Sequence, residues 1–314
     1  MMKAMYTEEE RKLLSECRLC PRECGADRFR GATGYCRSDA GMNIATICVH
    51  RGEEPPVSGP DGICNIFFSG CNLRCIYCQN HEISRSCREL RDSSPDYDTV
   101  LERIIRILDS GVKAVGFVSP SHVVPQVKAI IRGLQSKGYR PVTVYNTNGY
   151  DKPEVIDSLD GLINVYLPDY KYNSPVLSKE YSDAEDYPDI AFRALRRMYY
   201  QKGSTLQMDD DERAESGMLV RHLVLPGCSA DSKALLKKIA DELSPGIHLS
   251  LMSQYHPMPS VKDYPELNRI LYHAEYESVV AAMEELGFRN GWVQDMDSYR
   301  NYRPDFSREH PFEN

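Results

Sequence analysis

Short apolar runs alternate along the chain with longer segments in which apolar residues recur every three or four positions. The runs predict strands at residues 63–69, 114–118, 142–146, 163–167, 218–225 and 248–254. The periodic segments predict amphipathic helices, each with one apolar face. Their apolar positions are Leu101, Ile104, Ile105 and Leu108; Val127, Ile130, Ile131 and Leu134; and Val279, Ala282, Met283 and Leu286.

The repeated order of strand and helix determines the fold that we expect. Six such repeats imply a parallel sheet with right-handed crossovers, whose strands all end at one edge. The predicted fold is therefore α/β, a partial (β/α)6 TIM-like barrel with a small Cys-rich N-terminal module. We expect the module and its linker at 1–60, the barrel at 61–295 and a C-terminal tail at 296–314. The polar stretch 205–217 predicts a solvated loop, with a flap over the sheet edge as the alternative.

Composition and charge narrow the classes of function. The chain has 314 residues, with 38 Lys and Arg against 46 Asp and Glu, and its formal net charge of -8 disfavours a nucleic-acid partner. Its first residues lack the apolar core of a signal peptide, and no apolar run approaches the roughly 18 residues of a membrane span. These features predict a cytoplasmic protein without a membrane partner. In such a protein, 11 cysteines indicate metal binding or redox chemistry rather than disulfides.

Three cysteines follow the first predicted strand at the spacing C-x3-C-x2-C, namely Cys71, Cys75 and Cys78. Four cysteines complete the coordination of a four-iron cluster, whereas three leave one iron free to bind another molecule. The spacing therefore predicts a [4Fe-4S] cluster with one open iron. A zinc knuckle or a chance grouping is the alternative, but structural zinc sites usually have four ligands.

A second group of cysteines lies near the N-terminus and consists of Cys17, Cys20, Cys24 and Cys36. Four thiols within a short, glycine-containing segment predict a module held together by a metal. Tetrahedral zinc and a second iron–sulfur cluster suit four cysteines about equally, so the metal stays open. The third alternative is four free cysteines packed as small hydrophobic side chains, which the polar residues between them disfavour.

Polar residues follow the predicted strands at the edge where parallel barrels place their chemistry. Each alone is weak evidence, because an isolated histidine or an Asn-Thr-Asn-Gly segment is more often structural. Polar groups at five successive strand ends nevertheless predict a ligand-binding face. They include Ser119, Asn146, Thr147, Asn148, Asp169, Lys171, Arg221 and His256.

Several of these segments resemble the radical S-adenosylmethionine (radical SAM) superfamily, in an uncharacterised iron–sulfur branch related to the pyruvate formate-lyase activating enzymes. The C-x3-C-x2-C spacing carries the resemblance, together with the aromatic Tyr77 directly before Cys78. The other matching segments are residues 17–22, 52–56, 67–75, 145–150, 166–171 and 221–227. The resemblance covers roughly three quarters of the chain, from Cys17 to about His256.

The resemblance implies an oxidoreductase-type enzyme that holds a [4Fe-4S] cluster on the three cysteines and binds S-adenosylmethionine at the open iron. One electron from a flavodoxin-like or ferredoxin-like donor would cleave the sulfonium. The resulting 5'-deoxyadenosyl radical would abstract a hydrogen from an unknown substrate, for which a protein or peptide is one candidate. The implied cofactor-binding residues are Tyr77, Ser119, Asn146, Thr147, Asn148, Arg221 and His256, with Asp169 and Lys171 on the substrate side.

The chain departs from the family pattern after the second predicted strand. Many relatives have Gly-Gly-Glu there, and its carboxylate binds the amino group of the cofactor. This chain has Ser119 instead, and a neutral hydroxyl is a weaker partner for an ammonium than a carboxylate.

Two other classes of function remain open from the sequence. One is a non-catalytic iron–sulfur or zinc protein that carries electrons or senses redox state. The other is a radical enzyme that modifies RNA, which the net charge of -8 disfavours.

Overall fold

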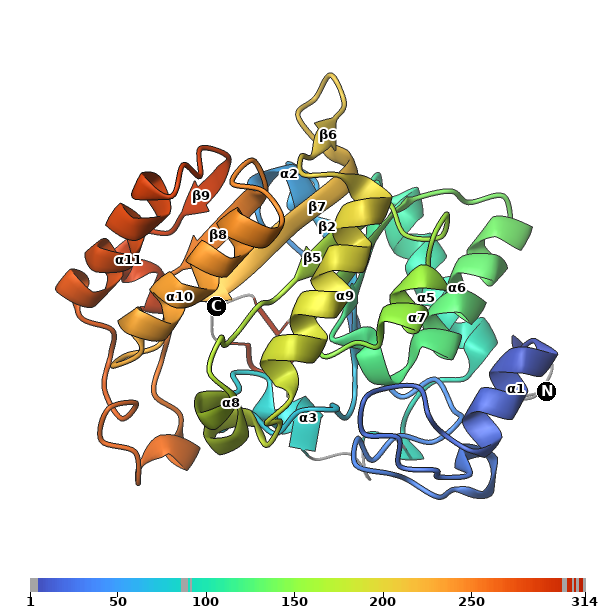
Figure 1. Ribbon diagram of the computed structural model, residues 1–314. Helices are drawn as coiled ribbons and strands as arrows, with labels where there is room; N and C mark the ends of the chain where they lie inside the picture. Colours follow the sequence, from blue (N-terminus) through green and yellow to red (C-terminus); the bar gives the residue numbers. More distant parts are fainter. Residues whose placement is uncertain are drawn as a thin grey trace.

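The computed structural model describes residues 5–85, 90, 92–300, 304–306, 308 and 311–312 (Figure 1). Its strands are β1 (Ile44–His50), β2 (Ile63–Phe68), β3 (Ala114–Val118), β4 (Val142–Thr147), β5 (Val165–Pro168), β6 (Gln207–Met208), β7 (Ala214–Leu223), β8 (His248–Met252) and β9 (Gly291–Val293). Its α-helices are α1 (Glu8–Ser15), α2 (Pro55–Ser58), α3 (His81–Arg85), α5 (Tyr97–Asp109), α6 (Val124–Ser136), α7 (Pro153–Asp157), α8 (Pro175–Ser182), α9 (Tyr187–Lys202), α10 (Ser229–Glu242) and α11 (His273–Glu285). The 3-10 helices are η2 (Arg28–Arg30), η3 (Pro120–His122), η4 (Pro259–Val261) and η5 (Met296–Arg300).

One curved sheet runs in the order β1-β2-β3-β4-β5-β7-β8-β9. From β2 to β9 the neighbours in this order are parallel, whereas β1 runs antiparallel to β2. The sheet does not close into a full barrel, and the longer helices pack along its outer face (Figure 1). The prediction of an α/β partial barrel is confirmed, and the six predicted strands correspond to β2, β3, β4, β5, β7 and β8.

Burial explains why these segments form parallel strands and covering helices. Every residue of β2, β3, β5 and β8 is buried, as expected for strands that are covered on both faces. Helix α5 begins where the side chain of Asp96 accepts a hydrogen bond from the backbone of Thr99. It ends before Gly111, whose φ of +110° is accessible to glycine. Among the described residues, no helix is long and apolar enough to cross a membrane.

The N-terminal segment contributes to the main sheet. β1 lies within the predicted module at 1–60 and forms the strand next to β2, so the sheet begins before the predicted barrel boundary. The part of this segment before β1 lies toward the end of the sheet where α3 and α8 are found, whereas α2 lies at the opposite end, beside β7 (Figure 1). In the predicted tail, residues 301–303, 307, 309–310 and 313–314 lie outside the described residues. The rings of Phe306 and Phe312 pack against Phe67 of β2. The division into domains at 1–60, 61–295 and 296–314 stays a prediction.

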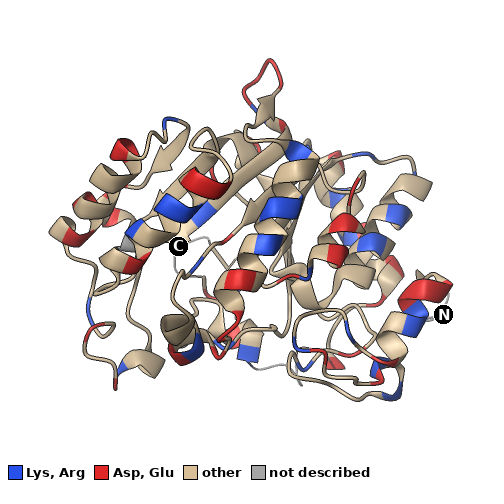
Figure 2. Cartoon of the chain, in the orientation of Figure 1, with Lys and Arg blue, Asp and Glu red and all other residues tan. Residues whose placement is uncertain are grey.

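The polar stretch 205–217 forms the short antiparallel pairing of β6 with β7. Its acidic tip projects from the end of the sheet opposite to α3 and α8 (Figure 2). Because β7 starts in this hairpin, the hairpin lies at the N-terminal end of the strand. The solvated loop that we predicted is therefore the better description, and the alternative of a flap over the C-terminal edge is wrong.

Candidate functional site

A cavity of about 430 Å³ lies at the C-terminal ends of the parallel strands. This volume is in the range of roughly 300 to 1,000 Å³ that is typical of small-molecule sites. The loop after β2 contributes the three cysteines, and the ends of β3, β4, β5 and β7 contribute polar residues. The predicted residues that line the cavity are Cys71, Cys75, Tyr77, Cys78, Ser119, Asn146, Asn148, Asp169, Lys171 and Arg221.

Polar groups surround the sulfur atoms of the cysteine loop. Asn148 Nδ2 and the backbone N–H of Leu73 each donate a hydrogen bond of 3.4 Å to Cys71 Sγ. The Sγ of Cys78 lies 3.6 Å from the Oγ of Ser84. Hydrogen bonds to sulfur stabilise the thiolate form that binds iron, and they influence the reduction potential of a cluster.

A chain of hydroxyl groups ends at Cys75. Ser182 Oγ, at the end of α8, donates to Cys75 Sγ over 2.9 Å, and Tyr172 Oη lies 2.7 Å from Ser182 Oγ. Tyr77 Oη lies 2.6 Å from Tyr172 Oη. Because Ser182 gives its single proton to the sulfur, Tyr172 donates to Ser182 and Tyr77 donates to Tyr172. Tyr77, predicted from its place in the cysteine motif, therefore acts on Cys75 through two other hydroxyls.

The donor set fits a [4Fe-4S] cluster. Burial raises the pKa of the Cys71 thiol to about 12 and also raises the pKa of Cys75, so iron must displace their protons. Throughout the described ranges, no three His, Cys, Asp or Glu side chains are arranged as ligands of one metal ion. The three thiolates of a four-iron cube bind three different irons and need a wider spacing. Cys71, Cys75 and Cys78 line one cavity and are the kind of donor set that such a cube takes.

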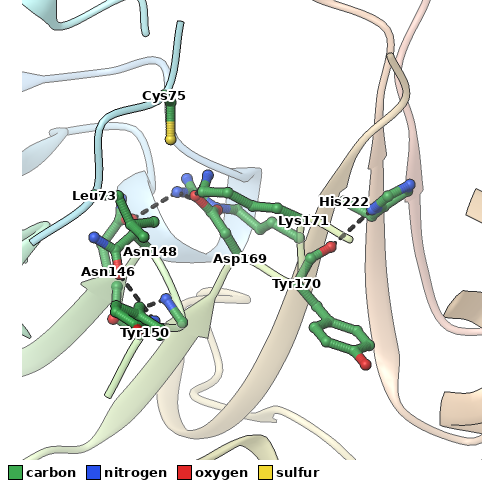
Figure 3. Close-up of polar contacts among 12 residues, drawn as sticks. Leu73, Cys75, Asn146, Asn148, Tyr150, Asp169, Tyr170, Lys171 and His222 are labelled. Carbon is green, nitrogen blue, oxygen red and sulfur yellow. Dashed lines mark hydrogen bonds and ion pairs between the residues drawn. The ribbon is translucent and has the colours of Figure 1, made fainter. Parts of the chain in front are cut away.

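A network of paired charges forms the opposite wall of the cavity (Figure 3). The guanidinium of Arg221 contacts Glu53 at 3.2 Å and Asp169 at 3.0 Å, and it donates a hydrogen bond of 2.6 Å to Asn146. Lys171 Nζ lies 2.7 Å from the other oxygen of Asp169. The four charged side chains are only 9% to 18% exposed. Two cations and two anions therefore form a neutral, rigid wall.

The pKa shifts in this wall follow from its pairing. Burial alone would raise the pKa of Asp169, but Lys171 and Arg221 lower it below its ordinary value. Burial likewise opposes the charged form of Lys171, yet Asp169 and the Cys75 thiol raise its pKa. Both groups remain charged at neutral pH. Figure 3 shows the sulfur of Cys75 pointing from its loop toward these side chains.

Two glutamates of the site were missed in the sequence. Glu53 and Glu54 belong to the segment 50–60, which we predicted to be a linker loop, and both line the cavity. Glu53 Oε1 accepts hydrogen bonds from Asn65 and Asn146. Within the part of the chain that the structure describes, Glu54 Oε2 is buried without a partner, and burial raises the pKa of this carboxyl. The signal available in the sequence was the pair of adjacent glutamates in residues 52–56, one of the segments that resemble the radical SAM superfamily.

Two predicted residues lie outside the described cavity lining, and Ser119 within it has an unusual backbone conformation. Thr147 is fully buried and hydrogen-bonds to Asp151, so it supports the strand end without facing the cavity. His256 follows β8 but does not belong to the described cavity lining, whereas Gln254 of the same stretch does. Ser119 lines the cavity with a left-handed φ of +51°, which is costly for a residue other than glycine.

The four N-terminal cysteines lie outside the cavity lining and beside the loop that carries Cys71. Cys17, Cys20 and Cys36 are buried and Cys24 is exposed. A Cβ atom on Gly70 would approach the carbonyl oxygen of Cys36 to 2.3 Å, so the two cysteine groups are in direct backbone contact.

Comparison with known proteins gives the following matches. Residues 65–198 match the radical SAM superfamily. An uncharacterized protein of Methanocaldococcus jannaschii is 28% identical over 287 residues, which cover 90% of this chain and 78% of that protein. The 7-carboxy-7-deazaguanine synthase of Methanopyrus kandleri is 27% identical over 216 residues, which cover 61% of this chain and 81% of that protein. The solved domain of a pyruvate-formate lyase-activating enzyme from Bacteroides vulgatus is 12% identical with a TM-score of 0.38, covering 55% of this chain and 93% of that domain.

Proposed function

Because residues 65–198 form a radical SAM domain, we propose that the protein is an enzyme that cleaves S-adenosylmethionine at a [4Fe-4S] cluster on Cys71, Cys75 and Cys78. Superfamily membership supports the cofactor and the cleavage. The observation that carries the proposal for this chain is that the three thiols and the charged wall of Arg221 and Asp169 line the same cavity.

When bound, the cluster supplies the electron that cleaves the sulfonium, which yields methionine and a 5'-deoxyadenosyl radical for hydrogen abstraction. The chain itself holds and tunes the thiolates. Asn148 and Ser182 donate hydrogen bonds to Cys71 and Cys75 and stabilise negative charge on sulfur. Buried Tyr77, whose ring packs against Tyr255, shields this side of the loop from water.

Glu53 is the group that we assign to the amino end of the cofactor. The family places a carboxylate after the second strand, where this chain has Ser119, whereas Glu53 brings a carboxylate into the same cavity from the loop before β2. Asn65, Asn146 and Arg221 fix its orientation. A carboxylate in this position accepts a charge-assisted hydrogen bond from an ammonium.

Asp169 and Lys171 are the groups that we assign to the substrate side. They lie at the end of β5, and their charges interact with Cys75 across the cavity. Both side chains are held by their ion pair, so they present a fixed donor and a fixed acceptor to a bound molecule. We propose a flavodoxin-like or ferredoxin-like protein as the electron donor, while the substrate class stays open, with a protein or peptide as one candidate and a small molecule as the other.

The test is anaerobic reconstitution with iron and sulfide, followed by reduction in the presence of S-adenosylmethionine and quantification of 5'-deoxyadenosine. The wild-type protein should release 5'-deoxyadenosine, and the Cys75→Ala variant should not. Cys64→Ala is the matched control, because Cys64 is buried in β2 outside the cavity lining and its loss should leave the product yield unchanged. A wild-type protein that binds the cluster but forms no 5'-deoxyadenosine would instead be the non-catalytic redox protein.

A further inference from the structure

The four N-terminal cysteines converge on one buried guanidinium. The charge of Arg28 interacts most strongly with the thiols of Cys36, Cys17, Cys20 and Cys24. Arg28 Nη2 lies 3.3 Å from Cys36 Sγ. The four thiols also affect one another electrostatically. Besides burial, Cys24 and Cys36 raise the pKa of Cys17, and Cys36 and Cys17 raise the pKa of Cys20. The four thiols thus lie near one guanidinium, but among the described residues no three of them are spaced as ligands of a single metal ion.

Arg28 lacks the partner that a buried cation normally has. Its side chain is 1% exposed, and it makes no ion pair with a described carboxylate. Its Nη1 donates to the carbonyl of His122 over 2.7 Å, and its Nε is buried without a partner in the described part of the chain. An uncompensated buried charge is costly, so an anion is expected beside it.

We propose that Cys17, Cys20, Cys24 and Cys36 bind an iron–sulfur cluster whose negative charge is neutralised by Arg28. Neutral thiols would not compensate the guanidinium, whereas four thiolates on an iron–sulfur cluster form a centre of net negative charge. A cluster also suits thiols that are not spaced around a single metal ion, because each thiolate binds a different iron. Arg28 is then the charged hydrogen-bond partner that orients one ligand and stabilises the thiolates. This site is separate from the cluster site of the proposed function, which rests on Cys71, Cys75 and Cys78.

The metal centre would also brace the loop of the radical SAM cysteines. Beyond the contact of Cys36 with Gly70, Arg22 Nε donates to the carbonyl of Asn72 over 2.9 Å. The guanidinium of Arg74 donates to the carbonyl of Tyr35. Three contacts thus join the segment between Cys20 and Cys36 to residues 70–74. Ordering of this segment by a metal therefore fixes the backbone that carries Cys71.

The test counts zinc, iron and sulfide per chain in protein purified without oxygen. It uses the Cys75→Ala background, in which the radical SAM cluster is absent. One set of iron and sulfide should remain in this variant, and zinc should not replace it. Adding Cys20→Ser or Cys24→Ser should remove that metal, whereas adding Cys64→Ala should not. Cys24 is exposed, so its serine variant tests the site without disturbing a packed core.

A Cys75→Ala protein without metal, or one whose metal survives Cys24→Ser and Cys20→Ser, would overturn the assignment. Because the readout is metal content in a variant that cannot cleave the cofactor, its failure is distinct from failure of the proposed enzyme activity. The role of Arg28 is tested by chelator competition. Arg28→Met should weaken metal retention by about 10- to 100-fold, and Arg28→Lys should weaken it less. Equal retention in Arg28→Met and wild type would refute charge neutralisation.

Discussion

Removing the hydroxyl of Ser182 should make the radical SAM cluster harder to reduce. Ser182 Oγ donates to Cys75 Sγ over 2.9 Å, and this hydrogen bond strengthens when an added electron increases the negative charge on sulfur. A hydrogen bond to a charged group contributes about 1.5 to 3 kcal/mol. We take roughly half of this hydrogen-bond energy to be gained only when the cluster is reduced. The Ser182→Ala change then makes reduction less favourable by about 1 kcal/mol, or about 40 mV for one electron.

The assay is a reductive titration of the reconstituted cluster followed by electron paramagnetic resonance, for wild type and Ser182→Ala. The potential of the variant should be lower by about 40 mV. Tyr172→Phe should lower it less, because the bond from Ser182 to sulfur survives. Ser178→Ala is the control, since this buried serine of α8 bonds to the carbonyl of Pro175. An unchanged or higher potential in Ser182→Ala would refute the reasoning, provided that the variant retains its full iron content.

The other predictions concern backbone contact, cofactor binding and pH. Gly70→Ala should reduce iron retention and lower the free energy of unfolding by more than the roughly 1 to 3 kcal/mol expected of Gly138→Ala. Both glycines have a positive φ, but a Cβ atom on Gly70 would meet the carbonyl of Cys36, whereas one on Gly138 would meet open space. Equal denaturation midpoints and equal iron contents of the two variants would contradict this prediction. Glu53→Gln should weaken equilibrium binding of S-adenosylmethionine at least tenfold, because it loses a charge-assisted hydrogen bond of about 1.5 to 3 kcal/mol. An unchanged dissociation constant would contradict this assignment. Burial lowers the pKa of His222 to about 4, so on acidification the imidazole takes up a proton more readily in the unfolded chain than in the folded one. The free energy of unfolding should therefore fall by about 2 kcal/mol between pH 7.5 and about pH 5. Urea unfolding should show this loss reduced in His222→Asn, and an identical pH profile would contradict it.

Local patterns were sufficient to predict the central strands. The residues of β2 and β8 are buried on both faces, and that burial produces continuous apolar runs in the sequence. β1 was missed because only some of its residues are buried, and β9 because it has three residues. β7 starts at Ala214, earlier than predicted, because pairing with β6 extends it beyond its apolar run. Pairing between distant segments leaves little trace in a single sequence.

The site was predictable where function depends on close spacing. The three thiols of Cys71, Cys75 and Cys78 lie within one loop, so their spacing revealed them. Glu53 was missed because its significance comes from Arg221, which lies 168 residues further along the chain. Ser182 was missed for the same reason, since it reaches Cys75 from the end of α8.

Position at the end of a strand did not distinguish residues that line the cavity from residues that only support the strand end. Asn146 and Asn148 line the cavity, while Thr147 between them points to Asp151. This alternation follows from the two faces of a strand. His256 lies beyond the end of β8, where the loop path is set by tertiary packing, and Gln254 lines the cavity instead.

The central claim is that three cysteines leave one iron of the cluster open for the sulfonium cofactor. The most direct measurement is Mössbauer spectroscopy of the ⁵⁷Fe-reconstituted wild-type protein, before and after addition of S-adenosylmethionine, with the Cys75→Ala variant as the reference. Subtracting the Cys75→Ala spectrum removes the signals of a second centre at the N-terminal cysteines. The account predicts that one iron site changes its isomer shift and quadrupole splitting while the others stay constant. Identical spectra with and without the cofactor would contradict it.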